Sequence, residues 1–149
     1  MKMECSDVIK DIDTIYERFS IPGFLASHMK RVAKVGKYLC SHHPTISDSD
    51  CVVASLLLHD LGNVVKFDLE SRLSNELCTP DEKDRLKELQ SELIRTYGHD
   101  ADTATRYMVN SLDVPSKVLW LLENASWINI NNVSENNSVE LKICAYADY

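Results

Sequence analysis

Apolar residues recur at intervals of three and four positions from one end of the chain to the other, and this period limits the fold more than any other feature. The spacing places apolar side chains along one face of an α-helix, whereas a half-buried strand would alternate them. Only four glycines and four prolines interrupt the 149 residues. We therefore predict an all-α fold, a compact single-domain bundle of about six to seven helices over residues 1–149.

Helix boundaries are predicted from capping residues and from glycine and proline. Thr79 and Glu82 form a capping box around Pro80, and Gly98 ends the helix that they open. Residues 64–78 show no sustained period, which predicts an irregular loop, and an Asn-rich turn is expected between the last two helices, over residues 129–137. The predicted helices cover residues 8–19, 22–40, 47–63, 79–97, 99–114 and 115–122, with a last helix from about 138.

Two histidines are predicted at apolar helix faces. The helix over 22–40 turns its lysines to one side, and its inward face holds His28, Val32, Val35 and Leu39. The next helix is almost wholly apolar until it reaches His59 and Asp60. Burying a charge without a partner costs on the order of several kcal/mol. These side chains therefore need an ion, an acid or a hydrogen bond.

Composition excludes several classes of protein. The net charge of −7 argues against a general nucleic-acid coating protein, because such proteins neutralise phosphates with Lys and Arg, although local basic patches are compatible with it. Five irregularly spaced cysteines without a C-x-x-C pair fit neither a disulfide framework nor a zinc knuckle. No stretch approaches the roughly 20 apolar residues that span a bilayer. We expect a soluble, cytoplasmic protein in a reducing compartment, without a membrane partner.

A shared ion explains the buried histidines and Asp60 together. His28 alone would more often be a hydrogen-bonded core residue, but the adjacent pair of His59 and Asp60 after an apolar run favours a metal site. Asp148 lies in an otherwise apolar turn and is the candidate for a fourth ligand from a distant helix. Two imidazoles and two carboxylates suit one divalent transition metal, either Mn, Fe, Co, Ni or Zn.

The order of these residues resembles the H…HD…D pattern of the HD-domain superfamily of metal-dependent phosphohydrolases. His28 is followed by Leu-Leu-His-Asp-Leu-Gly over residues 57–62 and by Asp148, so the resemblance covers nearly the whole chain. It implies an all-helical core in which the positions matching His28, His59, Asp60 and Asp148 hold the metal.

The chain also departs from the family pattern. Many members carry a lysine where this chain has Asn63. Lys66 is a candidate substitute for holding a phosphoryl oxygen, since it shares a face with His59 if the helix continues, although an exposed lysine that begins a loop is the simpler interpretation. Members with two metals use further histidines after the pair, and only His99 remains here. A mononuclear site is therefore favoured.

Two further residues are candidates for substrate contacts. His99 either caps a helix start, or approaches the site as a substrate contact or second-metal ligand. Arg31 belongs to a basic helix face together with Lys30, Lys34 and Lys37. Such a face is usually solvated, and the alternative is a binding strip for a nucleotide phosphate or an RNA backbone.

The leading hypothesis is an enzyme that hydrolyses a phosphate ester or anhydride of a small nucleotide-like molecule; a nucleic-acid partner is not favoured. A divalent metal would activate the attacking water. Asp60 and Lys66 are the expected catalytic residues, with Asp60 orienting or deprotonating that water. One alternative is a non-catalytic nucleotide-binding or regulatory module. Another is a di-iron oxygenase, a branch of the same superfamily that needs more histidine ligands than this sequence offers.

The last helix stops in an apolar turn without a cap, so we expect a chain truncated at its C-terminus. Terminal helix turns fray. We therefore expect partial metal occupancy, or a displaced Asp148 while His28, His59 and Asp60 still converge.

Overall fold

The computed structural model describes residues 2–125, 133 and 137–148. These residues form helices and no strands, which confirms the predicted all-α fold. None of the described helices is both long and apolar enough to cross a membrane. In chain order the elements are α1 (Cys5–Lys10), α2 (Ile12–Arg18), α3 (Gly23–Ser41), α4 (Ser49–Leu58), the 3₁₀ helix η1 (Asn63–Lys66), α5 (Arg72–Leu77), α6 (Pro80–Tyr97), α7 (Ala101–Asn110), α8 (Ser116–Asn124) and α10 (Val139–Ala147).

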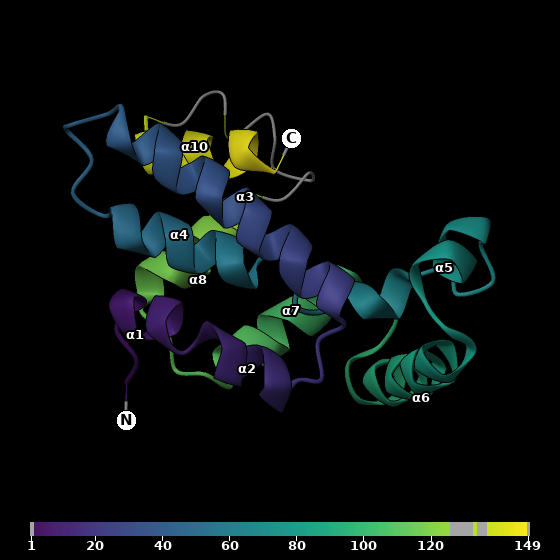
Figure 1. Cartoon of the computed structure of the whole chain (residues 1–149). Coiled ribbons are helices and arrows are strands. Elements are labelled where there is room, and N and C mark those ends of the chain that lie inside the picture. Colours follow the sequence, from purple (N-terminus) through teal and green to yellow (C-terminus); the bar gives the residue numbers. More distant parts are fainter. Residues whose placement is uncertain (1, 126–132, 134–136, 149) are drawn as a thin grey trace.

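Helix α4 forms the centre of the core. Every residue from 52 to 58 is buried, because α1, α3, α8 and α10 all pack against this short apolar helix (Figure 1). Helices α5 and α6 stand at one end of the molecule, where α6 contacts α7 and η1 (Figure 1). The C-terminal end of α4 is thus held within the bundle, and this end carries the His-Asp pair.

Three predicted boundaries are wrong. The helix predicted over 8–19 is broken at Asp11 into α1 and α2. The helix predicted to continue to Asn63 ends at Leu58, and the loop predicted over 64–78 contains most of η1 and all of α5. The backbone can leave the helix after Leu58 because other elements supply hydrogen bonds: Gln90 Nε2 in α6 donates to the carbonyl oxygens of Val64 and Phe67, over 2.9 and 2.7 Å.

The buried face of α3 is rotated from the predicted one. Val35, expected inside, is 45% exposed, whereas α3 buries Leu25, Met29, Val32, Ala33, Gly36 and Cys40. Gly36 explains the rotation, because a Cβ atom there would collide with Leu56 Cδ1 of α4. Because α3 and α4 approach closely, the buried face of α3 includes small residues. The hydrophobic period takes no account of side-chain size.

Other predicted helix ends are confirmed. The capping box of Thr79 and Glu82 opens α6, and Gly98, with φ 89°, closes it. Asp100 and Ser138 cap α7 and α10 by accepting hydrogen bonds from the backbone. The predicted Asn-rich turn lies outside the described residues, apart from positions 133 and 137.

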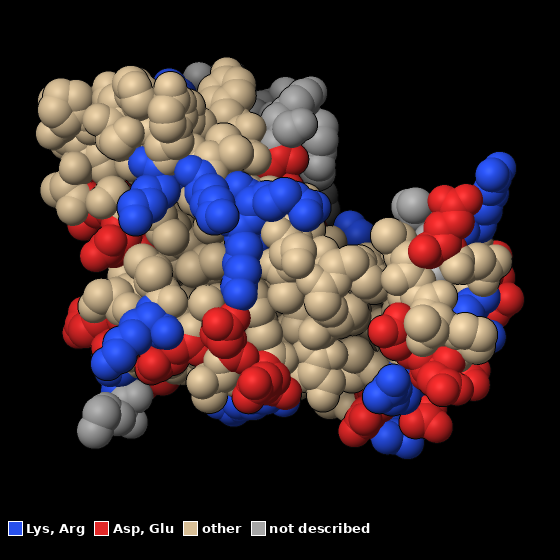
Figure 2. Space-filling model, in the orientation of Figure 1, with Lys and Arg blue, Asp and Glu red and all other residues tan. Residues whose placement is uncertain are grey.

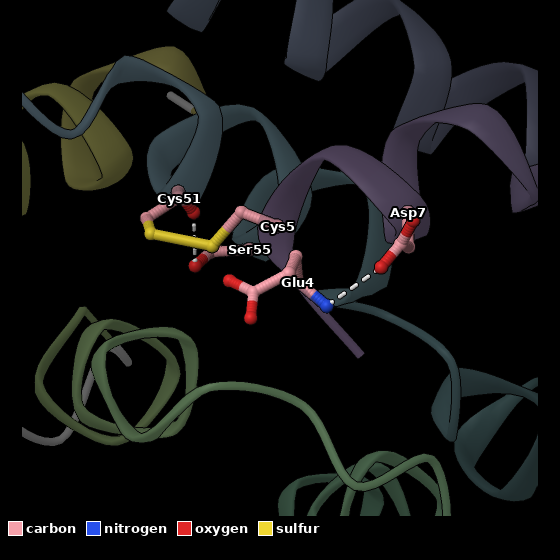
Figure 3. The surroundings of a disulfide bond; sticks show 5 residues. All are labelled: Glu4, Cys5, Asp7, Cys51 and Ser55. Atoms are coloured by element: carbon pink, nitrogen blue, oxygen red, sulfur yellow. Dashed lines mark hydrogen bonds between the residues drawn. A yellow bond between two sulfur atoms is a disulfide. The ribbon is translucent and has the colours of Figure 1, made fainter. Parts of the chain in front are cut away.

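A disulfide between Cys5 and Cys51 joins α1 to the first turn of α4 (Figure 3). The two Cα atoms are 5.2 Å apart, within the range that a disulfide bridges. The prediction that these cysteines form no disulfide framework is therefore wrong for one pair. The two cysteines are 46 residues apart, and only the packing of α1 on α4 brings them together. Cys40, Cys78 and Cys144 are free thiols.

Candidate metal centre

Four predicted side chains meet where α3, α4 and α10 converge. His28 comes from α3, His59 and Asp60 follow the last residue of α4, and Asp148 follows the last residue of α10. One ligand atom from each of the four lies within 4.8 Å of the others. His59 Nε2 is 3.1 Å from Asp148 Oδ1 and 3.2 Å from Asp60 Oδ2. His28 Nε2 is 3.5 Å from Asp148 Oδ1 and 3.2 Å from Asp60 Oδ2. Asp148 is not displaced from the cluster.

Buried hydrogen bonds hold the turn that carries His59 and Asp60. The Tyr16 hydroxyl of α2 donates to the Leu57 carbonyl over 2.7 Å, at the end of α4. The Gly62 N–H donates to Thr105 Oγ1 of α7 over 2.9 Å. His59 Nδ1 lies 2.5 Å from the Leu56 carbonyl oxygen. Because a carbonyl only accepts, Nδ1 carries a proton, and Nε2 is the ring nitrogen directed at the cluster.

The two carboxylates change the protonation of His59. Burial lowers the pKa of His59, but its hydrogen bonds to Asp148 and Asp60, and their negative charges, outweigh burial and raise the pKa to about 10. For Asp60 the directions are reversed. Burial raises the pKa of its carboxyl group, but the hydrogen bond to His59 and the charges of His59, His28 and Lys66 outweigh burial and lower the pKa overall. Without an ion, His59 is therefore an imidazolium that neutralises part of the acidic charge at neutral pH.

These residues fit a divalent transition metal. Tetrahedral ligands at about 2.1 Å from an ion lie roughly 3.4 Å from one another, close to the 3.1–3.5 Å that separate each histidine nitrogen from each aspartate oxygen of the cluster. The donor set of two imidazole nitrogens and two carboxylate oxygens suits Mn, Fe, Co, Ni or Zn. When an ion binds, His59 loses its extra proton, and the two carboxylates together then balance the two positive charges of the ion.

Cavities flank the cluster on two sides. The larger, of about 570 Å³, extends between α7, α8 and α10 and is lined by His59, Asp60 and Asp148. The smaller, of about 360 Å³, is lined by His28 and Asp60 and by the ring pair of Phe24 and Phe67. Asp60 lines both cavities, so an ion at the cluster would be accessible from either of them.

The candidate substrate residues differ in their placement. Lys66 lines the larger cavity, and its charge acts on Asp60, but it reaches this position from η1 and not from a continued α4 helix. Arg31 and His99 are exposed and line neither cavity. Asn63, where many family members have lysine, lines both.

Sequence reasoning missed the contribution of α7 to the larger cavity. Asp102, Thr105 and Arg106 of α7 line it, and Arg106 Nε lies 3.7 Å from Glu123 Oε1 of α8. The four-residue spacing of Asp102 and Arg106 places both on one helix face, which was an available signal. That this face points toward the cluster depends on how α7 packs against η1.

Comparison with known proteins agrees with this geometry. The family model described as HD domain matches residues 25–149, a span that includes all four cluster residues. The chain belongs to the HD-domain family. Neither the curated proteins nor the solved structures contain a match. Membership of the HD-domain family, taken with the histidine and aspartate cluster, indicates a metal site of the phosphohydrolase type.

Gly62 of the HD-domain turn is required by close packing, and replacing it with alanine is expected to destabilise the protein. An added Cβ would lie 2.5 Å from Thr105 N and 2.8 Å from Ala101 O, both backbone atoms of α7 that cannot rotate away. Overpacking of this kind costs roughly 1–3 kcal/mol. Urea unfolding of Gly62→Ala should show this loss. Gly23→Ala is the control, since nothing lies within 4 Å of its Cβ position. Equal stability of the two variants would contradict the packing role.

Proposed function

We propose that this chain is a metal-dependent phosphohydrolase acting on a nucleotide-like phosphate ester or anhydride. The observation that carries the proposal is the position of the His28, His59, Asp60 and Asp148 cluster, which borders a cavity that also contains cationic side chains. Lys66 and Arg106 line this cavity, and either can pair with a phosphoryl oxygen.

The residues divide the work of hydrolysis between them. A bound divalent ion would lower the pKa of a water molecule and stabilise the negative charge that develops on the phosphoryl group. Asp60 orients this water and accepts its proton. The water oxygen forms a bond to phosphorus while the bond from phosphorus to the leaving oxygen breaks, and the leaving oxygen takes up a proton. Lys66 offsets charge on the phosphoryl oxygens.

The lining of the larger cavity supports a nucleotide-like substrate. Its volume of about 570 Å³ lies within the roughly 300–1,000 Å³ of small-molecule sites. One part of its wall is apolar and is formed by Val109, Leu119 and Leu122. Asp100 and Asp102 at the same cavity are acceptors for hydroxyl or amino groups. An apolar wall, acceptors and two cations together suit a base, a sugar and a phosphate.

A hydrolysis screen tests this proposal. Chelator-treated protein is reloaded separately with each of the five metals and incubated with phosphomonoesters, nucleotides and cyclic dinucleotides, and the products are separated by chromatography, because opening a cyclic dinucleotide releases no free phosphate. We expect metal-dependent hydrolysis of at least one substrate, and a loss of about 10²–10⁴-fold in kcat for Asp60→Asn. Asp84→Asn, an exposed carboxylate of α6, is the matched control and should keep full activity.

The screen also separates an enzyme from a regulatory module. A metallated, folded protein that is inert on every substrate but binds a nucleotide tightly would replace the enzyme with the non-catalytic alternative. Asn63 is the feature that favours this alternative, because it lines both cavities at the position where many family members supply a lysine charge.

A further inference from the structure

Helix α3 has a charge opposite to that of the rest of the chain. Its nineteen residues include four cations, Lys30, Arg31, Lys34 and Lys37, and no Asp or Glu. The remaining residues hold twelve cations and all 23 acids, so the negative net charge of −7 comes entirely from residues outside α3. Figure 2 shows Lys and Arg side chains gathered in a band over α3. The basic charge is therefore concentrated on one helix.

Most of this charge is not neutralised within the protein. Lys30 Nζ lies 2.6 Å from Asp13 Oδ1 and is the cation that α2 pairs. Arg31, Lys34 and Lys37 form no ion pair with any residue between 2 and 125 or between 137 and 148. All three are exposed. A row of unpaired cations on an acidic protein is an electrostatic surface for a polyanion.

An exposed ring pair lies on the same face of the helix. Tyr38 is 64% exposed, and its ring centroid is 4.5 Å from that of His42. His42 Nδ1 lies 2.9 Å from the Tyr38 carbonyl oxygen, which fixes the imidazole against the phenol ring. Spacings of three and four residues place Arg31, Lys34 and Tyr38 along one stripe. An aromatic platform beside cations is the combination that holds unpaired bases and their phosphates.

The stripe leads to the metal centre. His28 lies one helical turn before Arg31, and Tyr38 lies ten residues beyond His28, about 15 Å along the helix axis. That length corresponds to roughly four nucleotides at the 3.4 Å rise of stacked bases. A strand that stacks a base on Tyr38 and pairs its phosphates with Lys34 and Arg31 therefore has one end within a helical turn of His28.

We propose that the α3 stripe, defined as Arg31, Lys34 and Tyr38, binds single-stranded nucleic acid and directs one end of it to the His/Asp cluster. The inference rests on the proposed phosphohydrolase function and narrows its substrate to an oligonucleotide end. A single strand fits better than a duplex, because Tyr38 can stack only on an unpaired base. It fits better than an anionic membrane, because α3 exposes only two large apolar side chains, Val35 and Tyr38, which are too few to insert into a bilayer.

Binding is measured without chemistry, by fluorescence anisotropy of labelled ten-nucleotide poly(rA) and poly(dT) with the metal-stripped full chain. Arg31→Gln/Lys34→Gln should weaken binding at least about tenfold and reduce the slope of log K against log salt by about 1.4, the value for two lost contacts to a single strand. Tyr38→Ala should weaken binding at least about fivefold, and Tyr38→Phe should restore it. A poly(dA) probe of the same length, compared with poly(rA), shows which sugar the stripe prefers.

The matched control is Arg85→Gln/Arg95→Gln, which removes the same charge from exposed positions of α6 and should bind like the parent. Parent-like binding by the stripe variants, or equal loss in the control, would overturn the inference. So would equally tight binding of a ten-base-pair duplex or of phosphatidylserine vesicles. If no substrate, oligonucleotides included, is ever hydrolysed but the stripe variants lose oligonucleotide binding, the proposed hydrolysis fails and the stripe stands. If nucleotides are hydrolysed but no oligonucleotide binds, the proposed hydrolysis stands and the proposed role of the stripe fails.

Discussion

Chelator-treated protein is expected to bind about one equivalent of Mn, Fe, Co, Ni or Zn, and His59→Ala is expected to lose at least about 100-fold in affinity. Substitution of residues that only orient a metal ligand already costs about 10- to 100-fold. His59 is itself a candidate ligand, its side chain is only 12% exposed, and its ring is fixed by the Leu56 carbonyl. Metal titration followed by elemental analysis measures both numbers.

The pH dependence of this affinity has a definite sign. The pKa of His59 is raised to about 10 in the metal-free protein, so His59 carries a proton throughout the neutral range. An ion must displace that proton, and metal binding should release it to the buffer. Affinity should therefore rise as the pH is raised through neutrality, by up to about tenfold per unit from this proton.

Three variants test the assignment. His43→Ala removes an exposed histidine outside the cluster and should bind metal like the parent. If His59→Ala and Asp60→Ala proteins are folded and retain as much metal as the parent, the four residues are not the metal site.

Reducing the disulfide between Cys5 and Cys51 is expected to lower the free energy of unfolding by about 4 kcal/mol. The crosslink closes a loop of 46 residues, and the loss of conformational entropy in the unfolded chain that such a loop imposes corresponds to about that value. Domains are commonly stable by only about 5–15 kcal/mol, so the change is a large part of the total.

Urea unfolding of the oxidised protein, of the reduced protein and of Cys5→Ser measures this difference. Cys78→Ser is the control, since this half-buried thiol is not part of the disulfide and its substitution should leave the effect of reduction intact. Superimposable curves for oxidised and reduced protein would show that the crosslink contributes nothing.

The fold class and the cluster were both predictable from local patterns. The three-and-four period identifies helices because each one buries a single face. His28, His59 and Asp60 were noticed because ionisable groups are costly on apolar surfaces, and Asp148 because it interrupts an apolar turn. Each of these signals lies within one helix or at its end.

What sequence reasoning missed depends on contacts between elements. The apolar period continues past Leu58, and the helix ends there because α6 and α7 supply hydrogen bonds to the chain that follows. Val35 was assigned to the core because it is apolar, but the close approach of α3 to α4 selects Gly36 instead. The pairing of Cys5 with Cys51 likewise exists only because α1 packs on α4.

The cluster joins parts of the chain that are far apart in sequence, since 89 residues separate His59 from Asp148. Closing so long a loop has an entropic cost, which here must be met by the packing of α10 on α3 and α4. A ligand that binds only the assembled cluster adds RT ln(1 + [L]/Kd) to stability, about 4 kcal/mol at a thousandfold excess over Kd. If the proposed ion binds, metal supply would set how often α10 detaches and is exposed to proteases, and cellular abundance of this protein would follow the availability of that ion.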